Sequence, residues 1–497
     1  MAGPVWLLCV VATCLIVTTN PASAATVRRG FRETVIASGL ENPTAMTVAP
    51  DGRIFVTQQR GEVRIIKDGI LLPDPFVTME VPLFDAGEQG LIGIALDPLF
   101  AINGFVYLHY TATTPDVHNR IIRLTAIGDT AAPDSEAVVL ELPGLGSTSH
   151  NGGALHFGPD GFLYIGVGEN SLRDEAQSLS SPLGKILRIA ADGSIPETNP
   201  FYGVTTGINR AIWALGLRNP FTFAIEPGSG RMFINDVGED DWEEINEGLA
   251  GANYGWPIAE GPNEEPSISS PLFAYSHDGG RCAIVGGAFY PLLSPQFPDE
   301  YAGDYFFADL CAGWIGHYDP ATGMASIDFA TRVGFPVDLA LSPEGGLYYV
   351  ERRRGLLVRI DYTGEDGPPA PDPVPPVIGP APTVPDLVPP VIDQGPLSQI
   401  VTAGHAATFL VKASSAAPIS YQWLRNDAVI PGATGSSYTL ARVTMADNGA
   451  RFNVRVWNAD GQVTSTAAIV TVPVLVQKGR QKTSKSVPTP KLVRSRK

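Results

Sequence analysis

The chain has 497 residues, of which 44% are hydrophobic and 17% are charged, and it contains 53 glycines and 44 prolines. This length predicts more than one domain, and the glycine and proline content favours a turn-rich β architecture over a helical one. The formal net charge of -17 excludes nucleic acid as an expected partner of the main body of the protein.

The N-terminal stretch, residues 1–24, is typical of a secretory signal peptide. An apolar run over residues 5–17 precedes Ala22-Ser23-Ala24, a small-residue cleavage site. No Lys or Arg precedes the run, so an uncleaved membrane anchor is the alternative, although the run is short for a spanning helix. We therefore expect a secreted or periplasmic protein with no membrane span once the signal is removed.

Four cysteines are present, and two of them, Cys9 and Cys14, lie in this signal. The other two, Cys282 and Cys311, form an even pair in an exported chain, which predicts a disulfide. A structural metal site is the weaker alternative, because two cysteines without a close pair of histidines make a poor ligand set.

One unit recurs through residues 31–362: an apolar strand, a Pro/Asp/Gly turn, a strand rich in Val, Ile, Phe and Tyr, and a third strand. Its six copies lie at residues 44–58, 93–110, 153–168, 222–238, 286–310 and 338–352. A repeat of about 45 to 70 residues predicts a six-bladed β-propeller. The alternation of Ile54 and Val56 with Arg53 and Phe55 predicts half-buried strands. Functional residues are then expected on the loops around the central shaft.

The third copy begins with a loop rich in Ser and Thr that leads to His150, Gly152 and Gly153. The unperturbed pKa of histidine lies near neutrality, so His150 is a candidate for proton transfer. Glu169 ends the next strand and would orient the imidazole, and the two glycines would let a flat ligand approach the backbone. The alternative is that His150 is a turn residue bonded to a backbone carbonyl.

A proline-rich segment follows the repeats at residues 363–396, which predicts an extended, semi-rigid spacer. Residues 397–476 then show short alternating strands separated by polar turns. This stretch resembles an immunoglobulin-like β-sandwich with Trp423 as its core tryptophan, and with Val411 and Val454 where the inter-sheet disulfide would sit.

The last segment, residues 477–497, is basic and contains Ser, Thr and Pro but no acid. This composition predicts a disordered, solvated tail. Contact between an anionic cell-surface polymer and the C-terminal module and tail is the alternative.

Three further stretches accompany the His150 loop, at residues 85–98, 213–220 and 234–257. Together they resemble the glucose/sorbosone dehydrogenase family, soluble quinoprotein sugar dehydrogenases that use pyrroloquinoline quinone (PQQ) and calcium. The patterns H-x-G-G-x-L-x-F-G-P-D-G, L-R-N-P and N-Y-G-W-P, in this order and spacing, carry the resemblance over residues 35–362. The expected fold class is all-β: a six-bladed β-propeller followed by an immunoglobulin-like β-sandwich.

The resemblance also implies roles for individual residues. His150 matches the base that takes a proton from the sugar hydroxyl while hydride passes to the quinone, and Glu169 stands where the family has an aspartate behind that base. The implied quinone contacts are Glu88, Gln89, Arg218 and Asn219. The backbone carbonyls of Gly238 and Glu239 match the ligands of the calcium that also holds the quinone. Glu243, Glu244 and the Tyr254 carbonyl match a second, structural calcium, and such a mixture of carbonyls and carboxylates suits Ca²⁺.

Several positions depart from the family pattern. The family's quinone-contacting glutamine falls on Glu88, beside a cofactor with three acids. A family lysine falls on Cys311, and two arginines fall on Phe335 and Val337. Other basic residues of the rim, Arg281 or Arg352, are the candidate replacements for the missing positive charge.

We therefore expect an exported oxidoreductase that oxidises a sugar, as an aldose or polyol hydroxyl, with PQQ as hydride acceptor and Ca²⁺ as Lewis acid. The alternative is a secreted carbohydrate- or protein-binding propeller that has lost PQQ. A third hypothesis is a calcium-dependent hydrolase of the lactonase kind, which needs a carboxylate-rich central metal site.

Overall fold

The structure, a computed structural model, describes residues 25–82, 87–292, 296–364, 390–415, 419–426, 428–458 and 461–473. The chain divides into two compact units, Met1–Pro385 and Asp386–Lys497. The predicted signal, the predicted tail and most of the predicted linker lie outside the described residues. Within the described part of the chain, the search for a helix long and apolar enough to cross a membrane found none.

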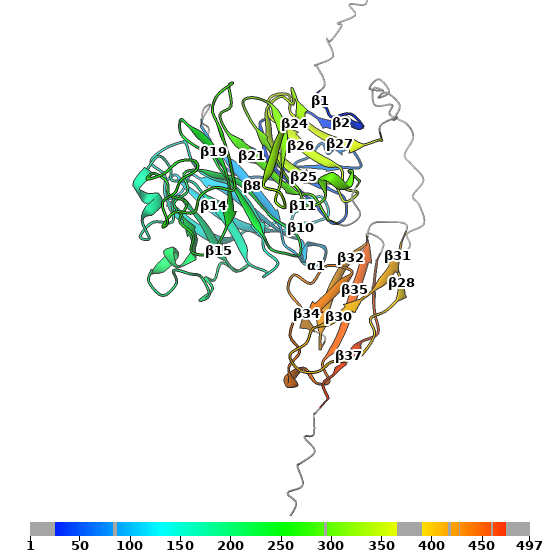
Figure 1. The fold of residues 1–497 in the computed structure, drawn as a ribbon. Coiled ribbons are helices and arrows are strands. Elements are labelled where there is room, and N and C mark those ends of the chain that lie inside the picture. The colour runs from blue at the N-terminus through cyan, green and yellow to red at the C-terminus, as the bar shows by residue number, and fades with distance from the viewer. Residues whose placement is uncertain are drawn as a thin grey trace, which may run out of the picture. The chain divides into compact units, whose positions relative to one another are not determined.

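Six antiparallel sheets form the described part of the first unit (Figure 1). The first sheet contains β3 (Pro43–Val48), β4 (Ile54–Gln58), β5 (Glu62–Lys67), β6 (Ile70–Leu71) and β7 (Val77–Thr78). The second contains β8 (Leu91–Leu96), β9 (Phe105–Ala112), β10 (His118–Ile127), β11 (Thr130–Ala131) and β12 (Ala137–Gly144), with the short helix α1 (Phe100–Asn103) after β8. The third contains β13 (Leu155–Phe157), β14 (Leu163–Val167), β15 (Lys185–Ile189) and β16 (Ile212–Leu215).

The other three sheets follow in chain order. The fourth contains β17 (Pro220–Ile225), β18 (Met232–Asp236), β19 (Trp242–Gly248) and β20 (Phe273–Ser276). The fifth contains β21 (Ile284–Phe289), β22 (Tyr305–Asp309), β23 (Trp314–Asp319) and β24 (Met324–Thr331), joined by β1 (Thr26–Val27). The sixth contains β25 (Pro336–Leu341), β26 (Leu347–Glu351) and β27 (Leu356–Tyr362), joined by β2 (Phe31–Ser38).

The sheets close into a ring. The first strand of each sheet from β3 to β25 contacts the first strand of the next, and β25 contacts β3. The ring is also locked by β2, because this N-terminal strand pairs with β27 as the outermost strand of the last sheet. The predicted six-bladed propeller is thus confirmed, and the inner strands β3, β8, β13, β17, β21 and β25 surround a central shaft.

The second strand of each blade is more buried than predicted. Ile54, Phe55 and Val56 in β4 are all buried, and the second strands β14, β18, β22 and β26 are buried along their whole length. The prediction of half-buried strands is wrong because each blade is covered on both faces by its neighbours. Phe55, for example, lies 5.9 Å from Phe100 of the next blade, measured between ring centroids.

The second unit consists of short strands around its own core. They are β28 (Val391–Gln394), β29 (Gln399–Ile400), β30 (Ala407–Leu410), β31 (Lys412–Ser414), β32 (Ser420–Arg425), β33 (Ala428–Val429), β34 (Ser437–Leu440), β35 (Arg451–Asn458), β36 (Gly461–Thr464) and β37 (Ala468–Thr471). Trp423 is fully buried and its indole N–H donates to the Gly435 carbonyl at 3.0 Å. Val411 and Val454 pack in the same cluster. The strand β28 lies inside the stretch predicted as linker and pairs with β31. Folded structure therefore begins before residue 397. The immunoglobulin-like assignment stays a prediction.

Candidate active site

A cavity of about 240 Å³ lies where the inner strands of the propeller begin. Its floor is formed by residues near the start of five inner strands, namely Thr44, Ile92, Phe221, Val285 and Val337. Its walls carry four polar residues from loops far apart in the chain, Gln59, Glu88, Asn219 and Arg352. Ring closure therefore gathers polar groups around one mouth of the shaft, as the prediction of loop-borne function requires.

His150 lies beside this mouth, on the loop between β12 and β13. Its φ of 56° is in the left-handed region, which histidine adopts more readily than most residues. The backbone is held there because the His150 carbonyl accepts the Asn170 N–H at 3.0 Å. The ring Nδ1 is hydrogen-bonded to Oε1 of Glu169. This bond leaves Nε2 as the nitrogen available to another molecule.

Glu169 is almost completely buried, whereas the side chain of His150 is 18% exposed. The second oxygen of Glu169, Oε2, has no hydrogen-bond partner among the described residues. The structure thus brings together the predicted base and the predicted orienting acid. A buried carboxylate behind an accessible imidazole is the arrangement that fixes the tautomer of a general base.

Asn219 connects the parts of the mouth. Its Oδ1 accepts the Gly152 N–H at 3.0 Å, next to His150, and its Nδ2 donates to Oε2 of Glu88 at 3.2 Å. The same Glu88 oxygen accepts the Asn151 N–H at 3.1 Å. Because one amide bridges two loops and a carboxylate, Asn219 sets the distance between the His150 loop and the Glu88 loop.

Asp236, at the end of β18, holds the turn that carries Arg218 and Asn219. Its two oxygens accept the backbone N–H groups of these residues at 2.9 and 2.7 Å. Burial raises the pKa of Asp236 to about 8, and the neighbouring Glu244 adds to the rise. The sequence analysis missed this residue; the signal available was an acid at the C-terminal end of a buried strand.

Arg352 is the cation that lines the cavity, while Arg218, next to Asn219 in the chain, lines a separate small void. Arg218 donates from Nη1 to the Val237 carbonyl at 3.1 Å, and its Nε has no partner among the described residues. Arg352 donates to the carbonyls of Asn42 and Pro43 at 3.2 and 3.0 Å and to the side chain of Gln59. Burial lowers the pKa of Arg352. Neither guanidinium pairs with a described Asp or Glu side chain.

Gln89 and Arg281, two other candidates, do not line the cavity. The side chain of Gln89 is buried and donates to the Ser147 carbonyl at 3.2 Å. Arg281 donates to the Asp278 carbonyl and stands over the Tyr275 ring. Of the two replacements suggested for the missing charge, Arg352 is therefore the one at the mouth.

The predicted calcium ligands are divided between two faces of β19. Glu243 is buried and accepts hydrogen bonds from the Ile284 N–H at 3.0 Å and from His277, with 2.7 Å between oxygen and Nε2. Glu244, on the opposite face, accepts the Gly261 N–H and an Asn246 N–H. Burial raises the pKa of Glu243 to about 9 and also raises that of Glu244.

The remaining members of that set also have protein partners. The side chain of Glu239 forms a surface ion pair with Arg173. Tyr254 donates its hydroxyl to the Glu247 carbonyl, and Gly238 is so tightly packed that a Cβ would lie 1.7 Å from the Trp242 carbonyl. Gly238, Glu244 and Tyr254 share a void of about 10 Å³ with other groups, which are Arg218, Asp236, Trp256, Ala259 and Glu260. Within the described ranges, no three His, Cys, Asp or Glu side chains gather as a metal site.

Two glycines beside His150 lie close to the backbone of neighbouring strands. A Cβ on Gly152 would lie 2.4 Å from the Gly166 carbonyl oxygen, and one on Gly153 would lie 2.9 Å from that of Ile92. These contacts explain why both positions are glycine, and the approach of a flat ligand to this backbone stays a prediction.

The predicted disulfide is present between Cys282 and Cys311, with 5.6 Å between the Cα atoms. It lies next to the mouth, since Ala283 and Leu310, the neighbours of the two cysteines, line the cavity.

Comparison with known proteins shows which family the chain of the propeller matches. Residues 40–364 match the family described as glucose/sorbosone dehydrogenase. The aldose sugar dehydrogenase YliI of Escherichia coli is 33% identical over 230 residues, which are 45% of this chain and 61% of that protein. The Hedgehog-interacting protein of Mus musculus is 30% identical over 229 residues, which are 40% of this chain and 32% of that protein. The match thus spans less than two thirds of the length of either relative.

Solved structures support the same fold. The soluble aldose sugar dehydrogenase of Escherichia coli in its apo-form has a TM-score of 0.61 and 27% identity, covering 67% of this chain and 99% of that one. The PQQ-bound aldose sugar dehydrogenase of Streptomyces coelicolor has a TM-score of 0.56 and 25% identity, covering 68% of this chain and 100% of that one. By the family match over residues 40–364, this chain belongs to the glucose/sorbosone dehydrogenase family.

Proposed function

We propose that this protein is an exported oxidoreductase that oxidises the hydroxyl of an aldose or polyol with PQQ, and that His150 is its general base. Family membership supports a sugar dehydrogenase-like oxidoreductase. The observation that carries the finer proposal is the hydrogen bond between His150 and buried Glu169, beside a cavity whose wall carries the guanidinium of Arg352.

The residues of the mouth fit a cofactor that carries carboxylates. A cation that is partly removed from water and bonded only to neutral oxygens is poorly stabilised by its own protein, and half-buried Arg352 is such a cation on the cavity wall. The Nε of Arg218 has no hydrogen-bond partner among the described residues. We assign Arg218, Arg352 and Asn219 to hold PQQ, because guanidinium groups pair well with carboxylates. When bound, PQQ supplies the acceptor for the hydride that leaves the sugar carbon.

The side chains of this protein then carry out the proton chemistry. Nε2 of His150 takes the proton of the sugar hydroxyl, and Glu169 keeps Nδ1 protonated and stabilises the imidazolium that forms. Arg218 and Arg352 provide positive charge where negative charge develops. The apolar floor of Ile92, Phe221, Val285 and Val337 keeps water from the base of the cavity.

Calcium was the second expected ligand, but the side chains of Glu243 and Glu244, which were expected to hold it together, do not converge on one point. Glu243 is bonded to His277 and Ile284 on one face of β19, while Glu244 and Tyr254 lie toward the other. Ca²⁺ needs six to eight oxygens around one point. We therefore derive no step through calcium.

The proposal is tested on purified protein incubated with PQQ and assayed for reduction of a dye by a panel of aldoses and polyols. Wild type is expected to turn over at least one sugar, and His150→Ala is expected to lose about 10²- to 10⁴-fold in kcat while still binding PQQ. His405→Ala, which removes an exposed histidine of the second unit, is the matched control. Full activity in His150→Ala would contradict the role of this residue.

A non-redox binding protein is the second candidate. Two observations favour it: the Hedgehog-interacting protein is a relative, and the carboxylate of Glu88 lies in the cavity wall, where it repels an acidic cofactor. Absence of PQQ binding at micromolar concentration, in protein that is folded by circular dichroism, would leave this second function in place of the first.

Export and surface contact remain proposals. The disulfide supports an oxidising compartment, while the predicted signal lies outside the described residues. Contact of the C-terminal module and tail with a cell-surface polymer has no support beyond the basic composition of the tail.

A further inference from the structure

The central shaft contains a second, larger cavity of about 410 Å³. It is lined by all six inner strands and reaches the residues that end them, such as Val48, Ile225 and Leu341. It therefore extends toward the mouth opposite to the candidate active site. Thr44, Ile92 and Phe221 line both cavities and form the boundary between them. Its volume falls within the range of about 300 to 1,000 Å³ that is usual for small-molecule sites.

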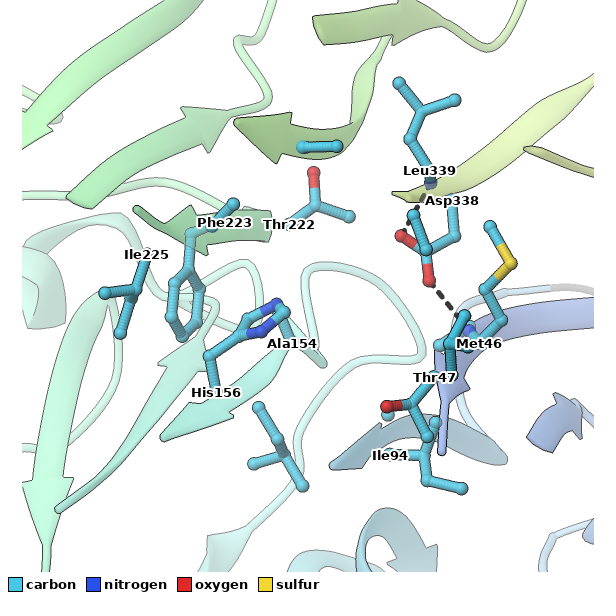
Figure 2. Close-up of a pocket in the computed structure, with 18 of the residues that line it drawn as sticks. Met46, Thr47, Ile94, Ala154, His156, Thr222, Phe223, Ile225, Asp338 and Leu339 are labelled. Atoms are coloured by element: carbon cyan, nitrogen blue, oxygen red, sulfur yellow. Dashed lines mark hydrogen bonds between the residues drawn. The ribbon is translucent and has the colours of Figure 1, made fainter. Parts of the chain in front are cut away.

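Asp338, on β25, is the acidic group of this cavity. One oxygen accepts the Met46 N–H at 2.7 Å and the other accepts the Leu339 N–H at 2.9 Å (Figure 2). The first bond joins the last blade to the first and explains why a carboxylate is tolerated here. A carboxylate has about four acceptor positions, so two remain for a ligand.

Among the described residues, Asp338 has no ion pair with a cation. The described residues that line the cavity include no Lys or Arg. His156, on the opposite side in Figure 2, is the second titratable side chain of the wall. Burial lowers the pKa of His156 to about 4, although a hydrogen bond with the Phe223 backbone acts in the opposite direction. His156 is therefore neutral at pH 7, and burial raises the pKa of Asp338 to about 7, as expected for an acid without a counter-ion.

The rest of the wall combines threonines with apolar and aromatic residues. Phe221, Phe223 and Phe289 line the cavity together with aliphatic residues such as Ile94 and Leu339. Aromatic faces attract organic cations, and they do so most strongly where water is excluded. Negative charge, aromatic rings and the absence of cations all select the same class of ligand.

We propose that the shaft is a binding site for a small organic ammonium ion, whose positive charge is held by Asp338 and whose carbon groups pack on Phe223 and Phe289. The site is independent of the sugar-oxidising function proposed for the other mouth, because it uses neither His150 nor Arg352.

The test compares choline with 3,3-dimethylbutan-1-ol, in which carbon replaces the charged nitrogen at the same shape. Binding to the full chain is measured by isothermal titration calorimetry at pH 8. Choline is expected to bind about tenfold or more tightly than the alcohol, the factor given by a desolvated cation–aromatic contact alone. Equal affinity of the two probes, or no binding of choline, would overturn the proposal.

Lowering the pH to 5.5 provides a second measurement on wild type. The charge of choline does not depend on pH, so a change reports on the protein. Protonation of Asp338 across this window is expected to weaken choline severalfold. The other titratable groups near Asp338 are His156 and Tyr305, and both stay neutral between pH 5.5 and 8. Unchanged choline affinity would contradict the role of Asp338.

Variants of residues that line the shaft test whether choline binds there. Asp338→Asn keeps an acceptor oxygen but removes the charge, and should abolish the preference for choline. Ala340→Leu adds volume on the same face of β25, because alternate residues of a strand share a face, and should weaken both probes. Asp134→Asn, an exposed carboxylate on a loop, is the charge-matched control. Choline binding that survives in both Asp338→Asn and Ala340→Leu would refute the site; if Asp338→Asn does not fold, Ala340→Leu and the two-probe comparison decide.

Discussion

Glu169 and His150 are 19 residues apart in the chain, yet a carboxylate oxygen of the first is hydrogen-bonded to Nδ1 of the second. The acid is almost completely buried, while the side chain of His150 is 18% exposed. An orienting group that is buried in this way cannot be replaced by water, so the pair acts as one unit.

Replacing the acid therefore tests the pair without touching the base. Glu169→Gln keeps the size of the side chain but removes the charge that stabilises the imidazolium. We expect kcat to fall by about 10²-fold or more, with little change in the dissociation constant of PQQ. Steady-state kinetics and a PQQ titration measure the two effects, and Glu197→Gln, at an exposed site, is the control. A change in KM alone would argue for a binding role.

Arg352 tests the assignment of the cofactor pocket. Arg352→Gln should weaken PQQ about tenfold or more, because a charge-assisted contact to a carboxylate is lost. The same variant should be at least as stable as wild type without cofactor, since it removes a half-buried charge that has no acidic partner among the described residues. Absorbance titration and thermal unfolding give the two values. Arg353→Gln, next in the chain and exposed, should change neither.

Glu243 predicts how stability depends on pH. Its pKa is raised to about 9 by burial, so between its ordinary pKa near 4.5 and pH 9 the folded protein keeps a proton that the unfolded chain releases. The free energy of unfolding must then fall as pH rises through this window, by up to about 1.4 kcal/mol per pH unit for each such group. Denaturant unfolding at pH 5.5 and 8.5 should show this fall, and Glu243→Gln should reduce it. Glu136→Gln, an exposed control, should leave the slope as in wild type; a slope of opposite sign would refute the prediction.

The disulfide should contribute substantially to stability. Cys282 and Cys311 close a loop with a sequence separation of 29, for which loop-closure entropy gives about 3 to 4 kcal/mol. In the double variant Cys282→Ser/Cys311→Ser, the free energy of unfolding should be lower by this amount. Denaturant unfolding measures the difference. Reductant should destabilise wild type in the same way and leave the double variant unchanged. Because Ala283 and Leu310 line the cavity, PQQ binding should weaken in parallel.

Local patterns in the sequence were sufficient for the fold. Each blade repeats the same order of apolar strands and Gly- or Pro-containing turns, and this order depends on neighbouring residues, so it can be recognised without long-range contacts. The pairing of Cys282 with Cys311 follows from count alone. The sequence pattern did not predict how deeply each strand is buried. Phe55 lies between apolar neighbours in the sequence, but its exposure to water depends on whether the next blade covers that face of the strand.

The site was predicted in part. His150 and Glu169 were singled out together because they lie at the two ends of one short hairpin, β13 and β14. Asp236 was not predicted, although it is an acid at the end of a buried strand, and only the fold places Arg352 at the cavity. The calcium sites stay predictions, and Glu243 and Glu244, as successive residues of a strand, point to opposite faces.

By itself, the sequence determined the propeller and the disulfide, since these depend on periodicity, composition and the number of cysteines, and it predicted His150 as the base. Only the tertiary structure decided which charges share the mouth with His150, and that Asp338 faces a second cavity without a cation. The physical reason is ring closure: residues as distant as Glu88 and Arg352, or Met46 and Asp338, meet only because the first and last blades are joined.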